Sequence, residues 1–298
     1  MKQKLKVAFL LFPHQASVLQ VEQHADALKN HYPDAIRMIS IPHGRNDLFD
    51  LVNKNGCFNF QTKGGPNHRL ARRALPLLSD IVFEAVDIVF FNTAMLRYPS
   101  PIFLDFVEKV LKCPSGNMFI GHSQAIDRDK LLPEDEEVKK SLMVDIFLSY
   151  LVCKTDRRVF ERFINLNAGI FGIKANSASD PFGLIRAVLN MKPYRDTDII
   201  ALLIALNLSA DLSIRTIDIG DIDLSPLKNN LSQLIEDAQF LLKRLESKGQ
   251  IGTRKELAGA IFDDTSYLKH IFKEDLREWF IAAVFELALS PNAPSHSV

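Results

Sequence analysis

Residues 86–110 read VDIVFFNTAMLRYPSPIFLDFVEKV, and this stretch decides the fold class. Its apolar run from Ile88 to Phe91 is short and stops abruptly at Asn92. A short run that is apolar on both faces and bounded by polar residues is typical of a buried parallel strand. Ligands in open α/β sheets bind just beyond the carboxyl ends of such strands. The stretch therefore predicts a buried strand that ends at Asn92 in either a ligand site or a simple turn.

Similar apolar runs alternate with helical patterns through the first half of the chain. We expect strands at residues 6–12, 36–41, 86–91 and 118–120, and helices at residues 18–30, 68–84 and 101–112. This alternation favours a parallel or mixed sheet. The segment SLMVDIFLSYLVC, which ends at Cys153, is compatible with either a helix or a strand.

The sequence beyond residue 224 has helical patterns only. Leucines at helical spacing follow Ser225 and Pro226, and Gly249 is a typical helix terminator. Thr253 and Glu256 have the spacing of a capping box, which predicts a second helix. A third helical pattern, EDLREWFIAAVFELAL, completes the helical part of the chain.

These patterns predict an α/β fold with a mixed, mainly parallel sheet flanked by helices and a C-terminal helical extension. We expect an α/β domain at residues 1–215 and the extension at residues 216–298. A chain of 298 residues with 47% hydrophobic residues can bury a core of this size. The leucine face of the extension is too apolar for water, so we expect it to pack on the domain or on a second copy, which would give a homo-oligomer.

The composition limits which partners and which cellular compartment we expect. The chain has 36 Lys and Arg residues and 36 Asp and Glu residues, so no net charge attracts nucleic acid. Its three cysteines are widely spaced, which argues against a disulfide framework or a zinc site and favours a reducing cytoplasm. The apolar runs are shorter than a spanning helix needs. We therefore expect a cytoplasmic chain that is soluble or peripheral to a membrane.

The order of the polar motifs carries a family resemblance. The motifs are PHGRND at residues 42–47, KGGPNHRLARRAL at 63–75, DIVFFNTA at 87–94, LNAGIFG at 166–172 and RDTD at 195–198. In this order, and together with the strands and helices between them, they resemble the family 2 glycosyltransferases, which have an A-type nucleotide-diphospho-sugar-binding fold.

The resemblance, which spans residues 6–207, implies a transferase of glycan biosynthesis. Such an enzyme moves a sugar from a nucleotide-diphosphate donor to a glycan or other hydroxyl acceptor with inversion. The match implies that Asp196 is the catalytic base. An inverting transfer needs a carboxylate to take the acceptor proton, and an aspartate is stabilised at a helix N-terminus. The alternative is that Asp196 is only a helix N-cap.

The resemblance also implies two sets of binding residues. The donor-binding set lies at the strand ends and in the basic helix, and consists of His14, Pro42, His43, Asp47, Arg69, Asn92 and Thr93. The acceptor-binding set consists of Asn167, Ala168, Gly169 and Asp198. Small residues in the second set would allow the backbone to approach the sugar closely.

Two positions depart from the family pattern. Pro42 stands where the family has an aspartate that contacts uracil, and Ala94 stands where it has a metal-holding acid. The family pattern implies Mn²⁺ or Mg²⁺, but such cations need carboxylate oxygens, so we assign no residue as a metal ligand. Arg69, Arg72 and Arg73 could instead neutralise a diphosphate, unless they form a solvated helix face.

Two other functions compete with glycosyl transfer. The first is a catalytically lapsed glycosyltransferase-like protein that binds a nucleotide, a glycan or a partner subunit. The second is a serine hydrolase, because GHSQA at residues 121–125 resembles a nucleophile elbow. However, a charged segment follows Ser123 where the elbow needs a buried helix, and no histidine pattern supports it. The sequence therefore favours glycosyl transfer over hydrolysis.

Overall fold

The computed structural model describes most of the chain, in two compact units. The described residues are 5–13, 16–42, 44–62, 86–93, 95–123, 134–152, 169–174, 214–247, 249, 251–264, 269 and 274–289. The first unit is formed from Met1–Gln124 and Ala168–Ile222, and the second from Ala125–Asn167 and Asp223–Val298.

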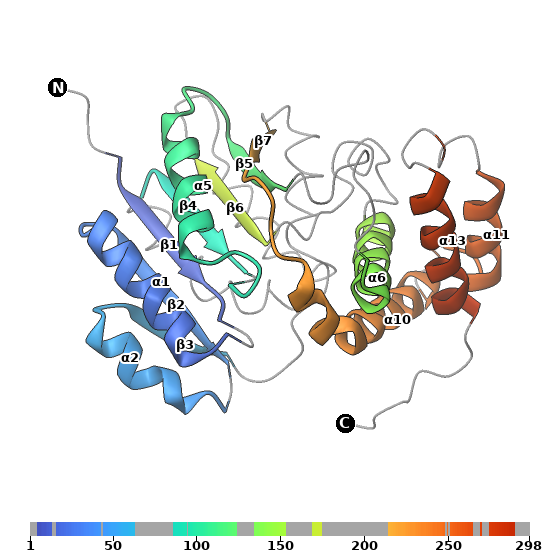
Figure 1. Ribbon diagram of the computed structural model, residues 1–298, viewed down its shortest axis with the longest axis horizontal. Helices are drawn as coiled ribbons and strands as arrows, with labels where there is room; N and C mark the ends of the chain where they lie inside the picture. Colours follow the sequence, from blue (N-terminus) through green and yellow to red (C-terminus); the bar gives the residue numbers. More distant parts are fainter. Residues whose placement is uncertain are drawn as a thin grey trace. The chain divides into compact units, whose positions relative to one another are not determined.

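The first unit is built on a seven-stranded sheet with the order β3-β2-β1-β4-β6-β5-β7 (Figure 1). Its strands are β1 (Val7–Leu11), β2 (Ile36–Pro42), β3 (Phe58–Thr62), β4 (Ile88–Asn92), β5 (Met118–His122), β6 (Ile170–Lys174) and β7 (Ile214–Asp218). Only β6 runs antiparallel to its neighbours, β4 and β5. The sheet is therefore mixed and mainly parallel, which confirms the predicted fold class.

The three strands predicted at residues 6–12, 36–41 and 86–91 are adjacent and parallel. Leu11 of β1 pairs with Ile39 of β2 on one side and with Asn92 of β4 on the other. The carboxyl ends of these strands therefore share one edge of the sheet. The strand order reverses between β1 and β4, which is where ligands bind in open α/β sheets. Strands β3, β6 and β7 were not predicted.

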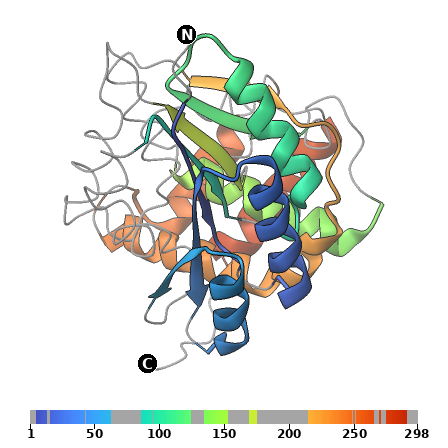
Figure 2. The same ribbon diagram turned by 90° about the vertical axis from the view of Figure 1, so that its left-hand side faces the viewer.

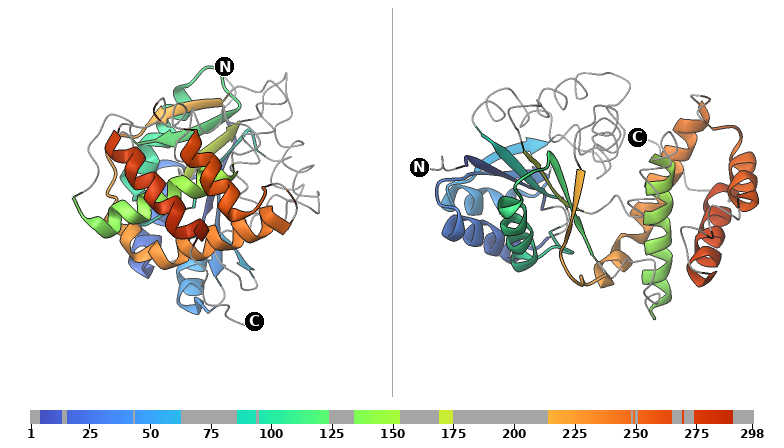
Figure 3. Two further views of the ribbon diagram at one scale, coloured as in Figure 1. Left: turned by 90° about the vertical axis from the view of Figure 1, so that its right-hand side faces the viewer. Right: turned by 90° about the horizontal axis from the view of Figure 1, so that it is seen from above.

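Helices α1 (Val18–His31), α2 (Phe49–Lys54) and α5 (Ser100–Lys112) lie on one face of the sheet, as Figures 2 and 3 show. Aromatic packing joins this face to the sheet. The Phe9 ring of β1 lies 5.3 Å from the Tyr32 ring, at the end of α1, and 6.1 Å from the Phe103 ring of α5. Both helices therefore pack over the same central strand.

The sequence of α5 explains its position. A proline in the first turn suits a helix start, where the missing N–H has no intrahelical partner. Phe103, Phe106, Val107 and Val110 follow at helical spacing, and all four are buried. The helix thus presents one continuous apolar face to the sheet.

Two residues of strand β6, Phe171 and Gly172, pack against aromatic rings of β4. Its Phe171 ring stacks on Phe91 of β4 at 4.3 Å. A Cβ atom at Gly172 would lie 3.0 Å from the Phe90 ring, which is closer than most such contacts. Gly172 therefore leaves room for the Phe90 ring.

The second unit is helical. It contains α6 (Glu136–Val152), the 3-10 helix η6 (Ser225–Asn230), α10 (Leu231–Ser247), α11 (Arg254–Asp263) and α13 (Glu274–Leu289). Helix α6 contacts α10 and α13, and α13 contacts α11 (Figure 3). The segment that the sequence left open between helix and strand is thus helical over residues 141–152, and this helix packs with the C-terminal helices.

Local signals at the helix ends agree with the expected pattern, with one difference. Thr253 and Glu256 form the predicted capping box. Residues 225–230, however, form a 3-10 helix before α10 begins at Leu231. On the predicted apolar face, three residues are buried, namely Leu227, Leu234 and Ala238, and three are partly exposed, namely Leu231, Leu241 and Leu245. None of the helices that the structure describes is long and apolar enough to cross a membrane.

Candidate functional site

The candidate site is the edge of the sheet at the carboxyl ends of β1, β2 and β4. Four predicted site residues there have described side chains or backbone contacts: Asp47, Asn92, Thr93 and Gly169. Pro42 is described as the last residue of β2, opposite Thr62 of β3. The other predicted site residues lie outside the described residues: His14, His43, Arg69, Asn167, Ala168, Asp196 and Asp198.

Asn92 ends β4 with a side chain that is turned into the helix-covered face. It is fully buried, and its Nδ2 donates to the Tyr98 carbonyl at 3.0 Å and lies 3.3 Å from His24 Nε2. Tyr98 precedes α5, and His24 belongs to α1. Asn92 therefore ties the strand end to both helices, and direct contact of its side chain with a donor stays a prediction.

His24 is the second polar group of this buried cluster. Its Nδ1 lies 3.0 Å from the Gln20 carbonyl, and its Nε2 lies 3.0 Å from the Tyr98 carbonyl. Burial lowers the pKa of His24, although hydrogen bonds to Gln20 and Tyr98 raise it. A neutral ring carries one N–H and can donate to only one carbonyl. With that hydrogen on Nδ1, the Nε2 atom accepts from the Asn92 amide.

Thr93 follows Asn92 and joins two segments that are far apart in the sequence. Its backbone N–H donates to the Gly169 carbonyl at 2.6 Å, and its hydroxyl donates to the same oxygen at 3.0 Å. Gly169 has φ +59°, a left-handed conformation that glycine adopts without strain. A predicted donor-binding residue and a predicted acceptor-binding residue are therefore in direct contact.

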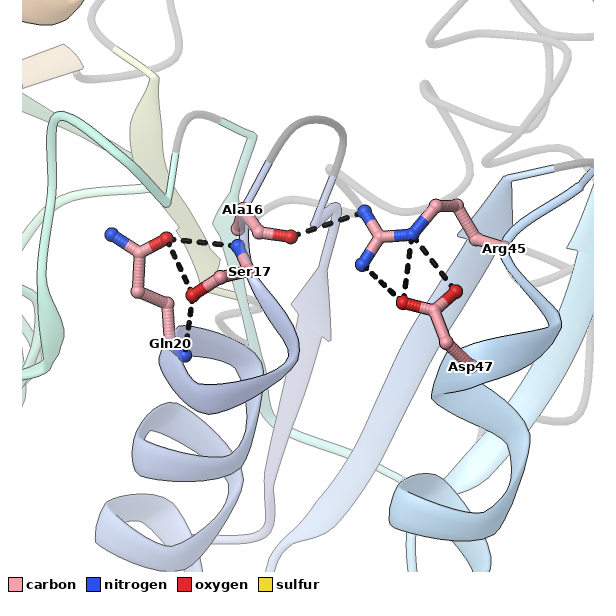
Figure 4. Close-up of polar contacts among 5 residues, drawn as sticks. All are labelled: Ala16, Ser17, Gln20, Arg45 and Asp47. Atoms are coloured by element: carbon pink, nitrogen blue, oxygen red, sulfur yellow. Dashed lines mark hydrogen bonds and ion pairs between the residues drawn. The ribbon is translucent and has the colours of Figure 1, made fainter.

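Asp47, predicted to bind the donor, is paired with Arg45 in the loop after β2 (Figure 4). Arg45 Nη2 lies 2.8 Å from the carboxylate, and its Nε lies 3.0 and 3.1 Å from the two oxygens. This hydrogen bonding holds the pKa of Asp47 below its usual value. Arg45 Nη1 also donates to the Ala16 carbonyl at 3.1 Å. The loop after β2 is thus linked to the loop after β1.

The loop after β1 is fixed at both ends. The Phe12 N–H donates to the Asn92 carbonyl at 2.9 Å, which continues the pairing of β1 with β4. Ser17 and Gln20 form a capping box at the start of α1, drawn in Figure 4. The Arg45 link to Ala16 lies between these two anchors in sequence.

The described residues do not fit a divalent cation of the kind that the resemblance implies. Within the ranges that the structure describes, no three His, Cys, Asp or Glu side chains are grouped as metal ligands. The Asn92 amide donates to a backbone carbonyl, and the Asp47 carboxylate is bound to a guanidinium. Mg²⁺ and Mn²⁺ need free carboxylate oxygens, which this part of the edge does not supply.

Ser123, the serine of the elbow-like motif, is buried beyond the end of β5. Its exposed fraction is 4%, and its hydroxyl donates to the Gly220 carbonyl at 2.9 Å. A nucleophilic serine must be presented to its substrate beside a base. This arrangement gives Ser123 a role in holding two loops together.

Sequence reasoning missed Arg45 and His24. Arg45 stands two residues before Asp47, so the spacing of opposite charges in HGRND could have indicated a local pair. His24 lies in the middle of a helical pattern, and its partners come from residues 4 and 74 positions away in the chain. No local signal identifies such a cluster.

No protein-family model matches this chain, and no curated protein matches it significantly. Among solved structures, the chain is similar to mannosyl-3-phosphoglycerate synthase from Rubrobacter xylanophilus. That match has a TM-score of 0.49 and 13% identity, and it covers 83% of this chain and 76% of that one. It is also similar to glucosyl-3-phosphoglycerate synthase from Mycobacterium tuberculosis in complex with uridine diphosphate. There the TM-score is 0.48 with 14% identity, covering 78% of this chain and 80% of that one. Similarity at this level assigns neither an activity nor a substrate to this chain.

Proposed function

We propose that this chain is a glycosyltransferase that moves a sugar from a nucleotide-diphosphate donor to a glycan or other hydroxyl acceptor. The observation that carries the proposal is the contact between Thr93 and Gly169. It joins the end of β4 to the segment that the resemblance identifies as acceptor-binding. The reversal of strand order between β1 and β4 at the same edge supports a ligand site there.

The proposed reaction is an inverting displacement. The acceptor oxygen forms a bond with the anomeric carbon of the sugar while the bond from that carbon to the diphosphate oxygen breaks. Nucleoside diphosphate leaves with the bonding electrons, and Asp196 takes the proton of the acceptor hydroxyl. General bases of this kind contribute about 10²–10⁴ in rate. The role of Asp196 rests on the resemblance of RDTD to the family motif.

Donor binding in this proposal depends on loop residues and arginines. Asp47 is already bound to Arg45, and Ala94 has no carboxylate, so the described part of this edge offers few metal ligands. Guanidinium groups bind diphosphate oxygens in a bidentate manner. We propose that Arg69 takes part in neutralising the diphosphate, alongside donor contacts from His14 and His43.

Calorimetry with UDP and GDP, each with and without Mn²⁺, tests donor binding. We expect saturable binding without metal. Binding that requires Mn²⁺ would point to a carboxylate set elsewhere, and absence of binding under all four conditions would contradict the proposal.

A second experiment compares Asp196→Asn with the wild type for sugar transfer. We expect most transfer to be lost and nucleotide affinity to be kept, whereas unchanged transfer would remove Asp196 from the mechanism.

The second candidate function is a catalytically lapsed protein that binds the nucleotide or a glycan without transfer. It is favoured by Pro42 and Ala94, which replace two acids of the family pattern. The two candidates differ in one measurable result. Release of nucleoside diphosphate from a donor panel in the presence of hydroxyl acceptors supports the enzyme, whereas tight binding without release supports the lapsed protein.

A further inference from the structure

Arg45 lies in the loop after β2, and its side chain reaches the loop after β1. Its guanidinium donates to the Ala16 carbonyl in one loop and to the Asp47 carboxylate in the other, as Figure 4 shows. Ala16 and Arg45 are 29 residues apart in the sequence. The planar guanidinium sets the direction of both contacts, which a lysine ammonium cannot do. The Arg45 bridge, defined as these contacts of Arg45 with Ala16 and Asp47, is therefore directional.

Stability alone does not account for the bridge. The side chains of Arg45 and Asp47 are 24% and 45% exposed, and ion pairs of this kind contribute only about 0–1 kcal/mol. The first unit already has a large buried core, which includes Phe9, Phe90 and Phe103. A bridge that adds little stability still fixes the relative position of the loops that it joins.

The position of the Arg45 bridge indicates which loops it holds in place. The loop after β1 is anchored to β4 at Phe12 and to α1 at Ser17, and Arg45 adds a contact at Ala16, in the segment between these anchors. That segment and the loop after β2 contain His14 and His43, which are both predicted donor contacts. Both loops follow strands whose carboxyl ends share the edge with β4.

We infer that Arg45 is a positioning residue of the donor site, and this inference rests on the proposed function. Arg45 holds the loops after β1 and β2 in the arrangement that receives the nucleotide diphosphate. Asp47 acts through Arg45, because its carboxylate orients the guanidinium toward Ala16. This role replaces a direct contact between Asp47 and the donor.

The test variant is Arg45→Lys, which keeps the charge and loses the directional fork. The matched control is Arg37→Lys, because Arg37 also donates to backbone carbonyls, those of Tyr32 at 3.2 Å and Pro33 at 3.3 Å. Arg37 lies in the first half of β2, away from the carboxyl edge. Hydrogen exchange of the full chain, read on peptides covering residues 12–20 and 43–50, should be faster in Arg45→Lys. The control should leave both peptides as in the wild type.

Calorimetry with UDP and GDP gives the second readout. For whichever nucleotide the wild type binds, we expect Arg45→Lys to lose about tenfold in affinity, which corresponds to about 1.4 kcal/mol. Arg37→Lys should bind as the wild type does. An equal loss in both variants would mean a general structural effect, and no loss in Arg45→Lys would overturn the inference even though the wild type binds.

A double-mutant cycle with Asp47→Asn separates an indirect role of Asp47 from a direct one. If Asp47 acts through Arg45, the double variant should lose no more affinity than Arg45→Lys alone. Additive losses would indicate that Asp47 contacts the donor itself.

If the wild type binds neither nucleotide, the proposed function and the donor-site role of Arg45 both fail. Hydrogen exchange then decides alone whether the bridge orders the loops.

Discussion

Two parts of the same sheet edge are held by opposite means. At the end of β4, Asn92 is fully buried and donates to a backbone carbonyl. In the loop after β2, Asp47 is 45% exposed and is paired with Arg45. Removing a buried hydrogen-bonding group leaves its partner unsatisfied and costs about 1–3 kcal/mol, whereas an exposed ion pair contributes about 0–1 kcal/mol. The β4 end therefore maintains the fold of the edge, and the β2 loop can be altered with little loss of stability.

The largest expected effect is that of Asn92→Leu. The variant removes the amide that donates to Tyr98 and faces His24, while keeping a side chain of similar size. We expect the free energy of unfolding to fall by about 1–3 kcal/mol, because buried polar groups lose a partner. Denaturant unfolding measures this change. Asn229→Leu is the control, because Asn229 is exposed in η6 and its replacement should change stability by about 0.5 kcal/mol or less. An equal effect in both variants would contradict the role of Asn92.

Gly169→Ala tests the contact with Thr93. At φ +59° an alanine costs about 1–2 kcal/mol, so we expect lower stability together with weaker nucleotide or acceptor binding. Gly249→Ala is the control, because Gly249 has φ +65° with no atom within 4 Å of the added Cβ. Thermal unfolding and calorimetry on both variants separate the two effects. Loss of binding in the control as well would mean that backbone strain alone, and not the Thr93 contact, weakens binding.

His24 predicts a pH dependence of the buried cluster. Burial lowers the pKa of His24 below its ordinary value of 6.5, so the unfolded chain binds this proton at a higher pH than the folded chain does. Stability must therefore fall as the pH drops below 6.5 and through the folded pKa. We expect the melting temperature of the wild type to fall more than that of His24→Gln between about pH 7 and about pH 5. Parallel curves for the two proteins would show that His24 does not titrate in this way.

The smallest expected effect is that of Asp47→Asn on stability. The lowered pKa of Asp47 means that its contribution is present above the ordinary value of 3.8 and is lost as the pH falls through the folded pKa. Because the group is exposed, we expect a change of about 0.5 kcal/mol or less at neutral pH. Denaturant unfolding provides the measurement. A loss comparable with that of Asn92→Leu would remove the contrast between the two regions.

Local patterns predicted the part of the fold that depends on local chemistry. The apolar runs that became β1 and β4 stand out because each is short, buried on both faces and bounded by polar residues. The capping box at Thr253 was also predicted, because its two partners are three residues apart. Strand β6 was not predicted, although its first three residues belong to the LNAGIFG motif. Its strand pairing depends on β4 and β5, which come from distant parts of the chain.

The candidate site also combines residues that the sequence indicated with contacts that only the fold revealed. The sequence indicated Asn92, Thr93 and Gly169 through motif resemblance, but it did not indicate that Thr93 donates to Gly169 across 76 residues. It also indicated Asp47 as a donor contact, which stays a prediction, and the structure adds that Asp47 is paired with Arg45. The spacing of Arg45 and Asp47 could have indicated their pairing, but nothing local indicated that Arg45 also donates to the Ala16 carbonyl, 29 residues away.

The sequence by itself determined the positions of β1, β2, β4 and β5, the mixed α/β class and the edge at which polar residues gather. These features depend on hydrophobic periodicity and helix capping, which act over a few residues. Only the tertiary structure decided that Asn92 turns inward to Tyr98 and that Arg45 joins two loops. Such choices depend on which face of a strand is covered and which loops meet. Both follow from the packing of segments that are distant in the chain, so local sequence contains no signal for them.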